Sequence, residues 1–516
     1  MKAKSADIKD QEEQELAILR ERVDEMEREQ GKKKLSNPAI LKMIDILESF
    51  LKKNEFICYG GTAINNILPK NRQFYDKDVE IPDYDFYSPT ALDSAKELAD
   101  IYSKHGYKEV EARAGVHHGT YKVFVNFIGI ADITYLDPIL YGELKKEAMR
   151  VDGIYYASPD YLRMGIYLEL SRPQGDISRW EKVYKRLRIL NDVHPIKKQE
   201  CGHIEFQRKM ENVKKEESES IFKIVRDELV ALNAVFFGGY ATNLYSVHVF
   251  GSKLSNFVKE SMTNPDFDVL LENIDAGAEN IQKALKQAGF EETNVIEHPQ
   301  LGEYIPRHKE ITVHGHPIAY LYEPVSCHSY NTIELPDEKK NIRVASIETL
   351  MAFYLAFMYT GYNYHYKDRI LCMANYLYYI QQKNPLKQTG LLKRFPMKCY
   401  GKQETLDDMR IEKNEMIKKL KPKTRTYEEW FLKYIPSTKG KGVKTIQFTR
   451  HSLTKRKSNP TVSISRVRGK TNKTKTKSKV NTKVNKSKSK TKSKSKTLKR
   501  KKPRSNKKNP FKRFFK

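Results

Sequence analysis

Hydrophobic residues recur at helical spacing in the charged segment that begins the chain. Leu16, Leu19, Val23 and Met26 are separated by three or four positions and lie among acidic and basic residues. Apolar positions at this spacing form one face of an α-helix. Residues 1–35 are therefore predicted to form a charged helical arm that packs on a partner or on the rest of the chain.

Beyond the arm, one pattern of apolar and polar segments occurs twice in the same order. An apolar strand ends at two glycines, a helix follows, and a pair of acids then flanks an aromatic residue. After another helix come strands that end before a proline, and then two more helices. The spacing is similar, because 22 residues separate Gly61 from Asp83 and 27 separate Gly239 from Asp266. Five shared features in one order indicate an internal duplication of an α+β unit.

The duplication divides the 516 residues into six predicted segments. They are an arm at 1–35, a first unit at 36–195, a connector at 196–214, a second unit at 215–395, a helical cap or connector at 396–436 and a tail at 437–516.

The first unit carries the most informative pattern, an alternation of acids and aromatic residues from Asp83 to Phe86. On a strand, residues two positions apart point to the same face, so Asp83 and Asp85 are predicted to project together. Asp132 ends another apolar strand and is expected beside them. Three close carboxylates are suited to two divalent cations, Mg²⁺ or Mn²⁺, which assist the attack and departure of oxygens in phosphoryl transfer. The nearby pair Asp76 and Asp78 flanks a lysine and is interpreted as a solvated loop.

Gly60 and Gly61 precede a helix and provide a second element of a phosphate site. Glycine lets the backbone approach a phosphate closely, and the first N–H groups of a helix bind anions. The polar side chains of Thr62 and Asn65 lie near that end of the helix. We therefore predict that Gly60, Gly61, Thr62 and Asn65 bind a nucleotide triphosphate.

The second unit retains two glycines and two acids but lacks the third acid. Gly238 and Gly239 match the first pair of glycines, and Asp266 and Asp268 match the first pair of acids. His316 or Pro317 is predicted where Asp132 stands in the first unit, and neither suits Mg²⁺. We interpret the second unit as non-catalytic, with Glu323 as a substitute ligand in the alternative hypothesis.

Weaker signals come from basic residues and histidines. Arg179, Lys182 and Arg186 share one face of a predicted helix. This face either contacts the triphosphate or is simply exposed to solvent, and both interpretations remain open. Lys182 and Arg186 are the residues predicted to contact the nucleotide. His117 and His118 lie in a predicted hairpin turn and are expected at the surface or against RNA, not as zinc ligands.

The net charge of +29 is concentrated at one end of the chain. Residues 437–516 contain 31 of the 94 Lys and Arg residues and no acid, so the other 436 residues carry 63 basic and 65 acidic residues. The tail has few large apolar residues and is predicted to be disordered. A polybasic segment binds polyanions without sequence preference; targeting and packaging are alternatives.

Cysteine usage and hydropathy bear on the compartment. The five cysteines are scattered, and a reducing, intracellular environment is the simplest interpretation. No apolar run approaches the roughly 20 residues needed to span a bilayer, and the charged beginning of the chain does not fit a secretory signal. We therefore expect no membrane association.

The glycine pair, the acid pair and the distal acid together resemble the signature of polymerase-β-like nucleotidyltransferases. More narrowly, YGGTAINNIL, PDYDFYS and ADITYLDP are similar to the catalytic subunits of poly(A) polymerases from poxviruses and giant DNA viruses. The resemblance covers roughly residues 36–430 and excludes the arm and the tail.

This resemblance implies tandem nucleotidyltransferase domains, the second degenerate, and template-independent polyadenylation of mRNA 3′ ends. It implies ATP as substrate, a divalent metal held by Asp83, Asp85 and Asp132, and an RNA primer as acceptor. It also implies a viral enzyme of the host cytoplasm or viral factory, or of the virion. An accessory processivity subunit or a homodimer is a further expectation.

Two alternatives remain open. Uridylyl-adding, CCA-adding and oligonucleotide-cyclising enzymes use the same triad, and the choice of base is not visible in these motifs. A non-catalytic RNA-binding or packaging protein on the same fold is the other class. The complete set of acids argues against it, because unused carboxylates that repel one another are costly to keep.

Overall fold

The computed structural model describes residues 14–436, except 24, 28, 31, 33–35, 77–80, 197–200, 202–209, 251–266, 303, 336–339, 363–364 and 384–385. The predicted tail, Asp266 and most of the predicted connector at 196–214 lie outside the described residues. Residues Met1–Ile446 belong to one compact unit, so the predicted units at 36–195 and 215–395 are halves of one packed body.

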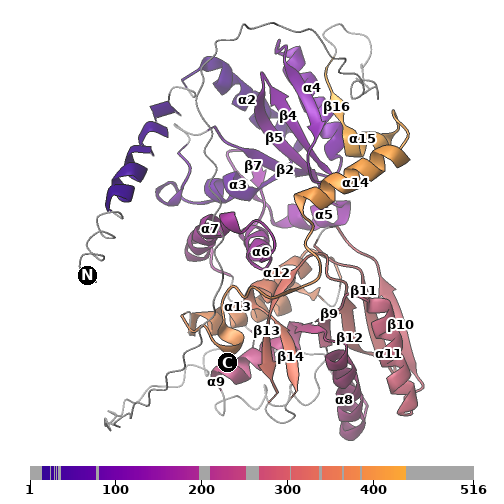
Figure 1. Cartoon of the computed structure of the whole chain (residues 1–516). Coiled ribbons are helices and arrows are strands. Elements are labelled where there is room, and N and C mark those ends of the chain that lie inside the picture. The colour runs from indigo at the N-terminus through magenta and orange to yellow at the C-terminus, as the bar shows by residue number, and fades with distance from the viewer. Residues whose placement is uncertain are drawn as a thin grey trace, which may run out of the picture. The chain divides into compact units, whose positions relative to one another are not determined.

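The first half is a mixed sheet flanked by helices (Figure 1). Its elements are α2 (Pro38–Asn54), β1 (Ile57–Tyr59), α3 (Gly60–Ile67), the 3-10 helix η1 (Lys70–Arg72), β2 (Tyr84–Ser88), α4 (Ala91–Lys104), β3 (Val110–Ala114), β4 (Thr120–Val125), β5 (Ile128–Tyr135), α5 (Pro138–Glu147), β6 (Met149–Val151), β7 (Ile154–Tyr156), α6 (Pro159–Leu170), η2 (Ile177–Arg179) and α7 (Trp180–Val193).

The second half repeats this arrangement. Its elements are α8 (Lys215–Ala231), β8 (Val235–Phe237), α9 (Gly238–Phe250), β9 (Phe267–Leu270), α11 (Ile274–Gln287), β10 (Thr293–His298), β11 (His308–Val313), β12 (His316–Tyr322), β13 (His328–Glu334), β14 (Asn341–Ala345), α12 (Ile347–Phe357) and α13 (Lys367–Lys383). The strand orders are β16-β3-β4-β5-β2-β1-β7-β6 and β10-β11-β12-β9-β8-β14-β13-β15. Seven strands of each sheet therefore follow the same order.

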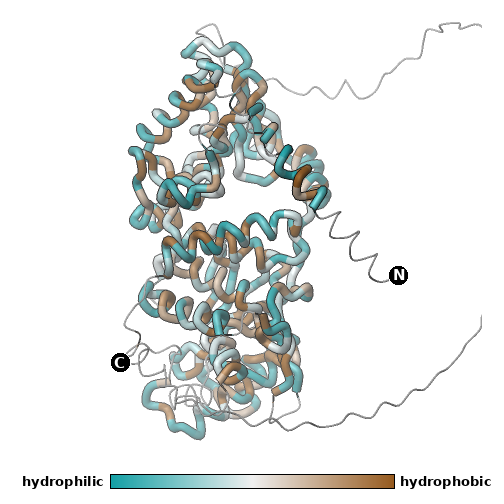
Figure 2. The backbone as a smooth tube through the Cα atoms, turned by 90° about the vertical axis from the view of Figure 1, so that its left-hand side faces the viewer, coloured by the Kyte–Doolittle hydropathy of each residue, from teal (hydrophilic) through white to brown (hydrophobic). Residues whose placement is uncertain are grey.

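Local sequence explains where these elements begin and which face they bury. Asn37 caps α2 by accepting the N–H of Ala39, and Pro38 occupies the first turn. Met43, Leu47 and Phe50 then recur on the buried face of α2. Hydrophobic and hydrophilic residues alternate along the helices of the described part (Figure 2). The two halves meet where α6 packs against α12, and Ser158 lies 2.8 Å from the hydroxyl of Tyr359.

Residues 396–436, predicted to form a helical cap or connector, contain helices α14 and α15 and also two short strands. The 3-10 helix η5 (Gly390–Leu392) comes just before this segment. The segment itself contains β15 (Cys399–Tyr400), α14 (Leu406–Lys419), α15 (Arg425–Phe431) and β16 (Lys433–Tyr434). Strand β15 pairs with β13 in the second sheet, and β16 pairs with β3 in the first. Strands of two residues are too short to show an alternating pattern in sequence, which is why they were not expected.

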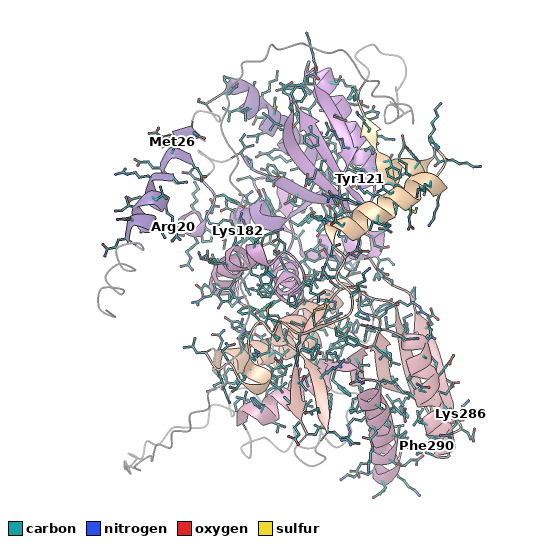
Figure 3. The ribbon with its side chains drawn as sticks, viewed as in Figure 1. Arg20, Met26, Tyr121, Lys182, Lys286 and Phe290 are labelled. Carbon is teal, nitrogen blue, oxygen red and sulfur yellow. A yellow bond between two sulfur atoms is a disulfide. The ribbon has the colours of Figure 1, made fainter. Side chains whose placement is uncertain are left out.

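The arm is helical within the described part of residues 14–32, as expected. Its apolar side chains, among them Leu19 and Met26, are 40–59% exposed. Figure 3 labels Met26 on this helix. The predicted apolar face is thus not buried on the described residues of this chain.

Four of the five cysteines pair in the structure. Disulfides join Cys201 to Cys372 and Cys327 to Cys399, and Cys58 is free and buried. Reduced thiols at these four positions, which the scattered spacing suggested, were thus not found. The partners are 171 and 72 residues apart in sequence, so only the fold brings them together. Within the described residues, no helix has both the length and the apolar character required to cross a bilayer.

Candidate active site

The sheet of the first half brings the three predicted acids together. Strand β5 runs parallel to β2 and places Asp132 directly opposite Asp85. Strand β1 runs antiparallel on the other side of β2 and places Tyr59 opposite Asp85. Asp83 immediately precedes β2, two positions before Asp85. The acids therefore lie on one face, close to the glycines that follow β1.

Mutual repulsion and burial disfavour the charged forms of these acids. Burial, and then the carboxylates of Asp83 and Asp132, raise the pKa of Asp85 to about 7. Burial and Asp132 likewise raise the pKa of Asp83. Lys122 opposes both shifts, and its ammonium forms an ion pair with Asp132, its neighbour across β4 and β5. Burial and repulsion among the carboxylates thus outweigh the nearby positive charges at Asp83 and Asp85.

The donor set fits a hard divalent cation, because Mg²⁺ and Mn²⁺ prefer carboxylate oxygens. In the described part of the chain, however, no three His, Cys, Asp or Glu side chains already have the arrangement of a metal site. Lys122 is bonded to one oxygen of Asp132. Its side chain is 44% exposed, so it has room to move aside for a cation.

Gly60 and Gly61 lie very close to other side chains of the site. Gly60 has a φ of +73°, and a Cβ atom there would lie 2.7 Å from Oδ2 of Asp85. A Cβ atom at Gly61 would lie 2.9 Å from both Nη1 of Arg186 and the hydroxyl of Tyr75. Helix α3 begins at Gly60, so its free N–H groups are at the acids.

Thr62 and Asn65 have protein partners in this structure. The Thr62 hydroxyl donates to the Asp83 carbonyl at 2.6 Å, and Oδ1 of Asn65 accepts the N–H groups of Phe74 and Tyr75 at 2.8 Å. Both residues line a cavity of about 270 Å³ that also includes Asp83. Their contacts fix the start of β2 and the loop at 73–75. Donation to a triphosphate by the Thr62 hydroxyl would replace its bond to the Asp83 carbonyl, whereas donation by the Asn65 amide nitrogen would leave the bonds of Oδ1 in place. Binding of a triphosphate by these two side chains stays a prediction.

The three basic residues of the predicted helix face separate into different environments. Arg186 is 8% exposed, lies over the rings of Phe74 and Tyr75, and borders Gly61. Lys182 is exposed on the same helix, α7 (Figure 3). Arg179 lies 3.3 Å from Glu169, and its positive charge opposes the rise in the pKa of Asp85. Arg186 is therefore the cation best placed beside the glycine turn.

The sequence analysis did not predict two residues of this site, Lys122 and Tyr75. Lys122 lies between the buried residues Tyr121 and Val123 on β4, so strand alternation alone places it on the face of the acids. Tyr75 bonds Arg186 and approaches Gly61. No motif marks Tyr75, because its position depends on the fold of the loop after α3.

The second half has a different residue at the third position from the one predicted. Tyr320 lies opposite Asp268, as Asp132 lies opposite Asp85. His316 instead begins β12, next to Pro317, so the predicted equivalence was wrong. The pairing of β12 with β9 decides which residue stands at this position, and the sequence of β12 alone does not show that register.

Aromatic rings fill the corresponding face of the second sheet. Phe237 lies 5.2 Å from Tyr322 and 5.0 Å from Phe353, and His308 stacks on Tyr322 at 4.5 Å. Glu323, the alternative ligand, lies 3.9 Å from Arg307. This half keeps the glycine turn, since a Cβ atom at Gly238 would overlap Asp268. The space for a nucleotide is thus occupied by protein.

Comparison with known proteins agrees with the resemblance found in the motifs. Residues 45–176, which include all three acids, match the protein family described as poly(A) polymerase catalytic subunit. A proposed poly(A) polymerase catalytic subunit of Acanthamoeba polyphaga mimivirus is 28% identical over 310 residues, which are 54% of this chain and 50% of that protein. Its counterpart from African swine fever virus (strain Badajoz 1971 Vero-adapted) is 29% identical over 159 residues, 30% of this chain and 33% of that protein. The matched regions thus span half or less of these relatives.

A solved structure shows the same fold. The crystal structure of the Megavirus polyadenylate synthase superposes on this chain with a TM-score of 0.68 and 20% sequence identity. The superposed region covers 78% of this chain and 84% of the Megavirus chain. The mixed α+β architecture is therefore that of a viral polyadenylate synthase.

Proposed function

We propose that this chain is a template-independent poly(A) polymerase built from tandem nucleotidyltransferase domains, of which the first is catalytic. It transfers AMP from ATP to the 3′-hydroxyl of mRNA and releases pyrophosphate. The observation that carries the proposal is the pairing of Asp85 with Asp132 across β2 and β5, beside the turn at Gly60. The matched family and relatives support the same chemistry.

The residues of the site have distinct roles in this reaction. The 3′-oxygen bonds to the α-phosphorus of ATP as its proton leaves, and the bond from that phosphorus to the bridging oxygen of pyrophosphate breaks. Gly60 and Gly61 let the triphosphate approach the N-terminus of α3, and Arg186 neutralises its charge. Asp83, Asp85 and Asp132 would hold two Mg²⁺ or Mn²⁺ ions, which supply charge neutralisation at the entering and leaving oxygens.

Partners and location follow from the same proposal. RNA is the acceptor, and residues 437–516 provide positive charge for it. Processivity comes from that charge, from a homodimer or from an accessory subunit. The enzyme works inside the infected cell, in the cytoplasm or viral factory, or is carried in the virion.

The decisive experiment incubates the full chain with short RNA, Mg²⁺ or Mn²⁺, and each nucleoside triphosphate separately. Extension with ATP alone is expected. Equal extension with UTP or CTP would favour another nucleotidyltransferase, and no extension would favour the non-catalytic alternative. Asp83→Asn, Asp85→Asn and Asp132→Asn should each lower the rate about 1000-fold with little change in melting temperature. Asp45→Asn, on the exposed face of α2, is the matched control.

A further inference from the structure

One loop of the second half contacts the sheet that carries the acids. Strands β10 and β11 are the counterparts of β3 and β4, because they have the same places in the two strand orders. The turn between β3 and β4 has five residues, 115–119, whereas the loop between β10 and β11 has nine, 299–307. We call residues 299–307 the tyrosine loop, after Tyr304. The longer loop reaches the first half.

The tyrosine loop is held in place by contacts within itself and with helix α5. The N–H of Leu301 donates to the carbonyl of Ile305 at 2.9 Å, and both side chains are buried. Between them, Gly302 has a φ of +58°, and a Cβ atom there would lie 2.5 Å from Cδ1 of Leu140 on α5. The backbone of the loop therefore packs directly against the first half.

Tyr304 of this loop contacts a tyrosine on β2. Its hydroxyl lies 3.0 Å from the hydroxyl of Tyr87. The ring of Tyr161, on α6, lies 5.9 Å from the rings of both Tyr87 and Tyr304. Tyr87 is 4% exposed, and a buried hydroxyl requires a hydrogen-bond partner. The second half thus supplies a partner for a buried side chain of the first.

Tyr87 lies on the face of the sheet that carries the acids. It follows Asp85 by two positions on β2, and residues two apart on a strand point to the same face. The ring of Tyr87 stacks on the ring of Tyr59 at 4.0 Å, with 12° between their planes. Tyr59 is the residue of β1 that lies opposite Asp85. Tyr304 therefore contacts the catalytic face, and only the ring of Tyr87 separates it from Tyr59.

Tyr59 adjoins each part of the proposed site. It lies opposite Asp85 and immediately precedes Gly60. Its hydroxyl lies 2.8 Å from Oγ1 of Thr134, which follows Asp132 by two positions on β5. Burial, and then the carboxylate of Asp85, raise the pKa of Tyr59, so its phenol stays neutral and acts by packing and hydrogen bonding. A displaced Tyr59 ring would thus disturb the glycine turn and both strands that carry acids.

We infer that Tyr304 is a positioning residue for the catalytic half. Through Tyr87 and Tyr59 it fixes the glycine turn and strand β2 in the arrangement that the reaction requires. The inference rests on the proposed function for the identity of that reaction. It also gives the second half a role that does not depend on a third acid, because this half completes the support of the active site in the first.

The test compares Tyr304→Phe with Tyr359→Phe in the full chain. Both keep the ring and remove a hydroxyl that joins the two halves, since the Tyr359 hydroxyl lies 2.8 Å from Oγ of Ser158. Tyr304→Phe should lower kcat for AMP addition to oligoadenylate about fivefold or more, because small displacements of reacting groups are costly in rate. Tyr87→Phe should do the same, and the double variant should be no slower, because the two hydroxyls act as a pair. Tyr359→Phe should stay within about twofold.

Amide hydrogen exchange without ATP, metal or RNA separates this inference from the proposed function. Tyr304→Phe should speed exchange in residues 57–61 and 84–88 about fivefold, the effect of one net hydrogen bond, and Tyr359→Phe should not. Faster exchange there supports the positioning role even if the wild-type chain extends no RNA. Wild-type exchange in both segments, the same change in both variants, or an unchanged kcat in an active chain overturns the inference. Tyr87→Phe replaces Tyr304→Phe if that variant unfolds.

Discussion

Gly60 and Asp85 are so close that no side chain fits between them: a Cβ atom at position 60 would lie 2.7 Å from Oδ2 of Asp85. The glycine turn and strand β2, which carries Asp85, are thus parts of one contact. The second half has the same relationship between Gly238 and Asp268. This contact makes the first prediction possible.

Gly60→Ala should reduce activity far more than stability. The alanine would adopt a left-handed φ, at about 1–2 kcal/mol, and would also push Asp85 from its place. A displacement of about 1 Å costs on the order of 100-fold in rate. Gly106→Ala is the control, because Gly106 has a φ of +93° and a Cβ atom there would meet nothing within 4 Å. Both variants should melt alike, and equal activities would disprove the contact.

Arg186 and Lys182 lie one helical turn apart on α7 and should differ in their effect on ATP. Arg186→Ala should lower kcat/KM for ATP by about 10- to 100-fold, the range for a lost hydrogen bond to a charged group. Lys182→Ala should stay within about threefold, because the exposed amine contributes only screened charge. Steady-state kinetics with saturating RNA measures both. A larger loss for Lys182→Ala would exchange their roles.

The second half should tolerate loss of its acids. Asp268→Asn, alone or with Asp266→Ala, should leave kcat/KM for ATP and RNA within about twofold, because Tyr320 stands where a third carboxylate is needed. The matched change in the first half is Asp85→Asn. Extension assays on folded protein compare the two. Loss of activity in the Asp268 variant would show that this half takes part in catalysis.

Removal of residues 437–516 should weaken RNA binding and leave chemistry on bound RNA intact. For every phosphate of single-stranded RNA that the protein no longer neutralises, the log–log salt slope falls by roughly 0.7. The measurement compares RNA affinity and product length at several salt concentrations for the full and truncated chains. Identical slopes would assign the tail to targeting or packaging.

Sequence patterns predicted the elements around the acids because those patterns are local. Alternation on β2 and β5 and the glycines after β1 depend on neighbouring residues, and they placed Asp83, Asp85 and Asp132 on one face. The error at Tyr320 came from a relationship that is not local. The register of β12 is defined by its pairing with β9 and β11, which are distant in sequence or separated from it by a turn.

Other features depended on contacts between distant residues. Cys327 and Cys399 meet because β15 returns to β13, and no spacing rule connects them. Asn65 has the residue type and position of a phosphate ligand, yet its amide holds the loop at Phe74 and Tyr75. Lys122 could have been found from the alternation of β4, since its neighbours are buried.

The last strand of the first sheet has a consequence for synthesis on the ribosome. Strand β16 pairs with β3, and Glu428, just before it, bonds Lys96 across 332 residues of sequence. A nascent chain therefore exposes the edge of β3 until translation has passed the whole second half, and exposed edges invite pairing with other chains. A premature stop codon between positions 133 and 433 would release a product that contains every proposed metal ligand but has an unfinished sheet. Completion of the first sheet thus requires translation through Tyr434, so truncated products would be clients of chaperones and proteases.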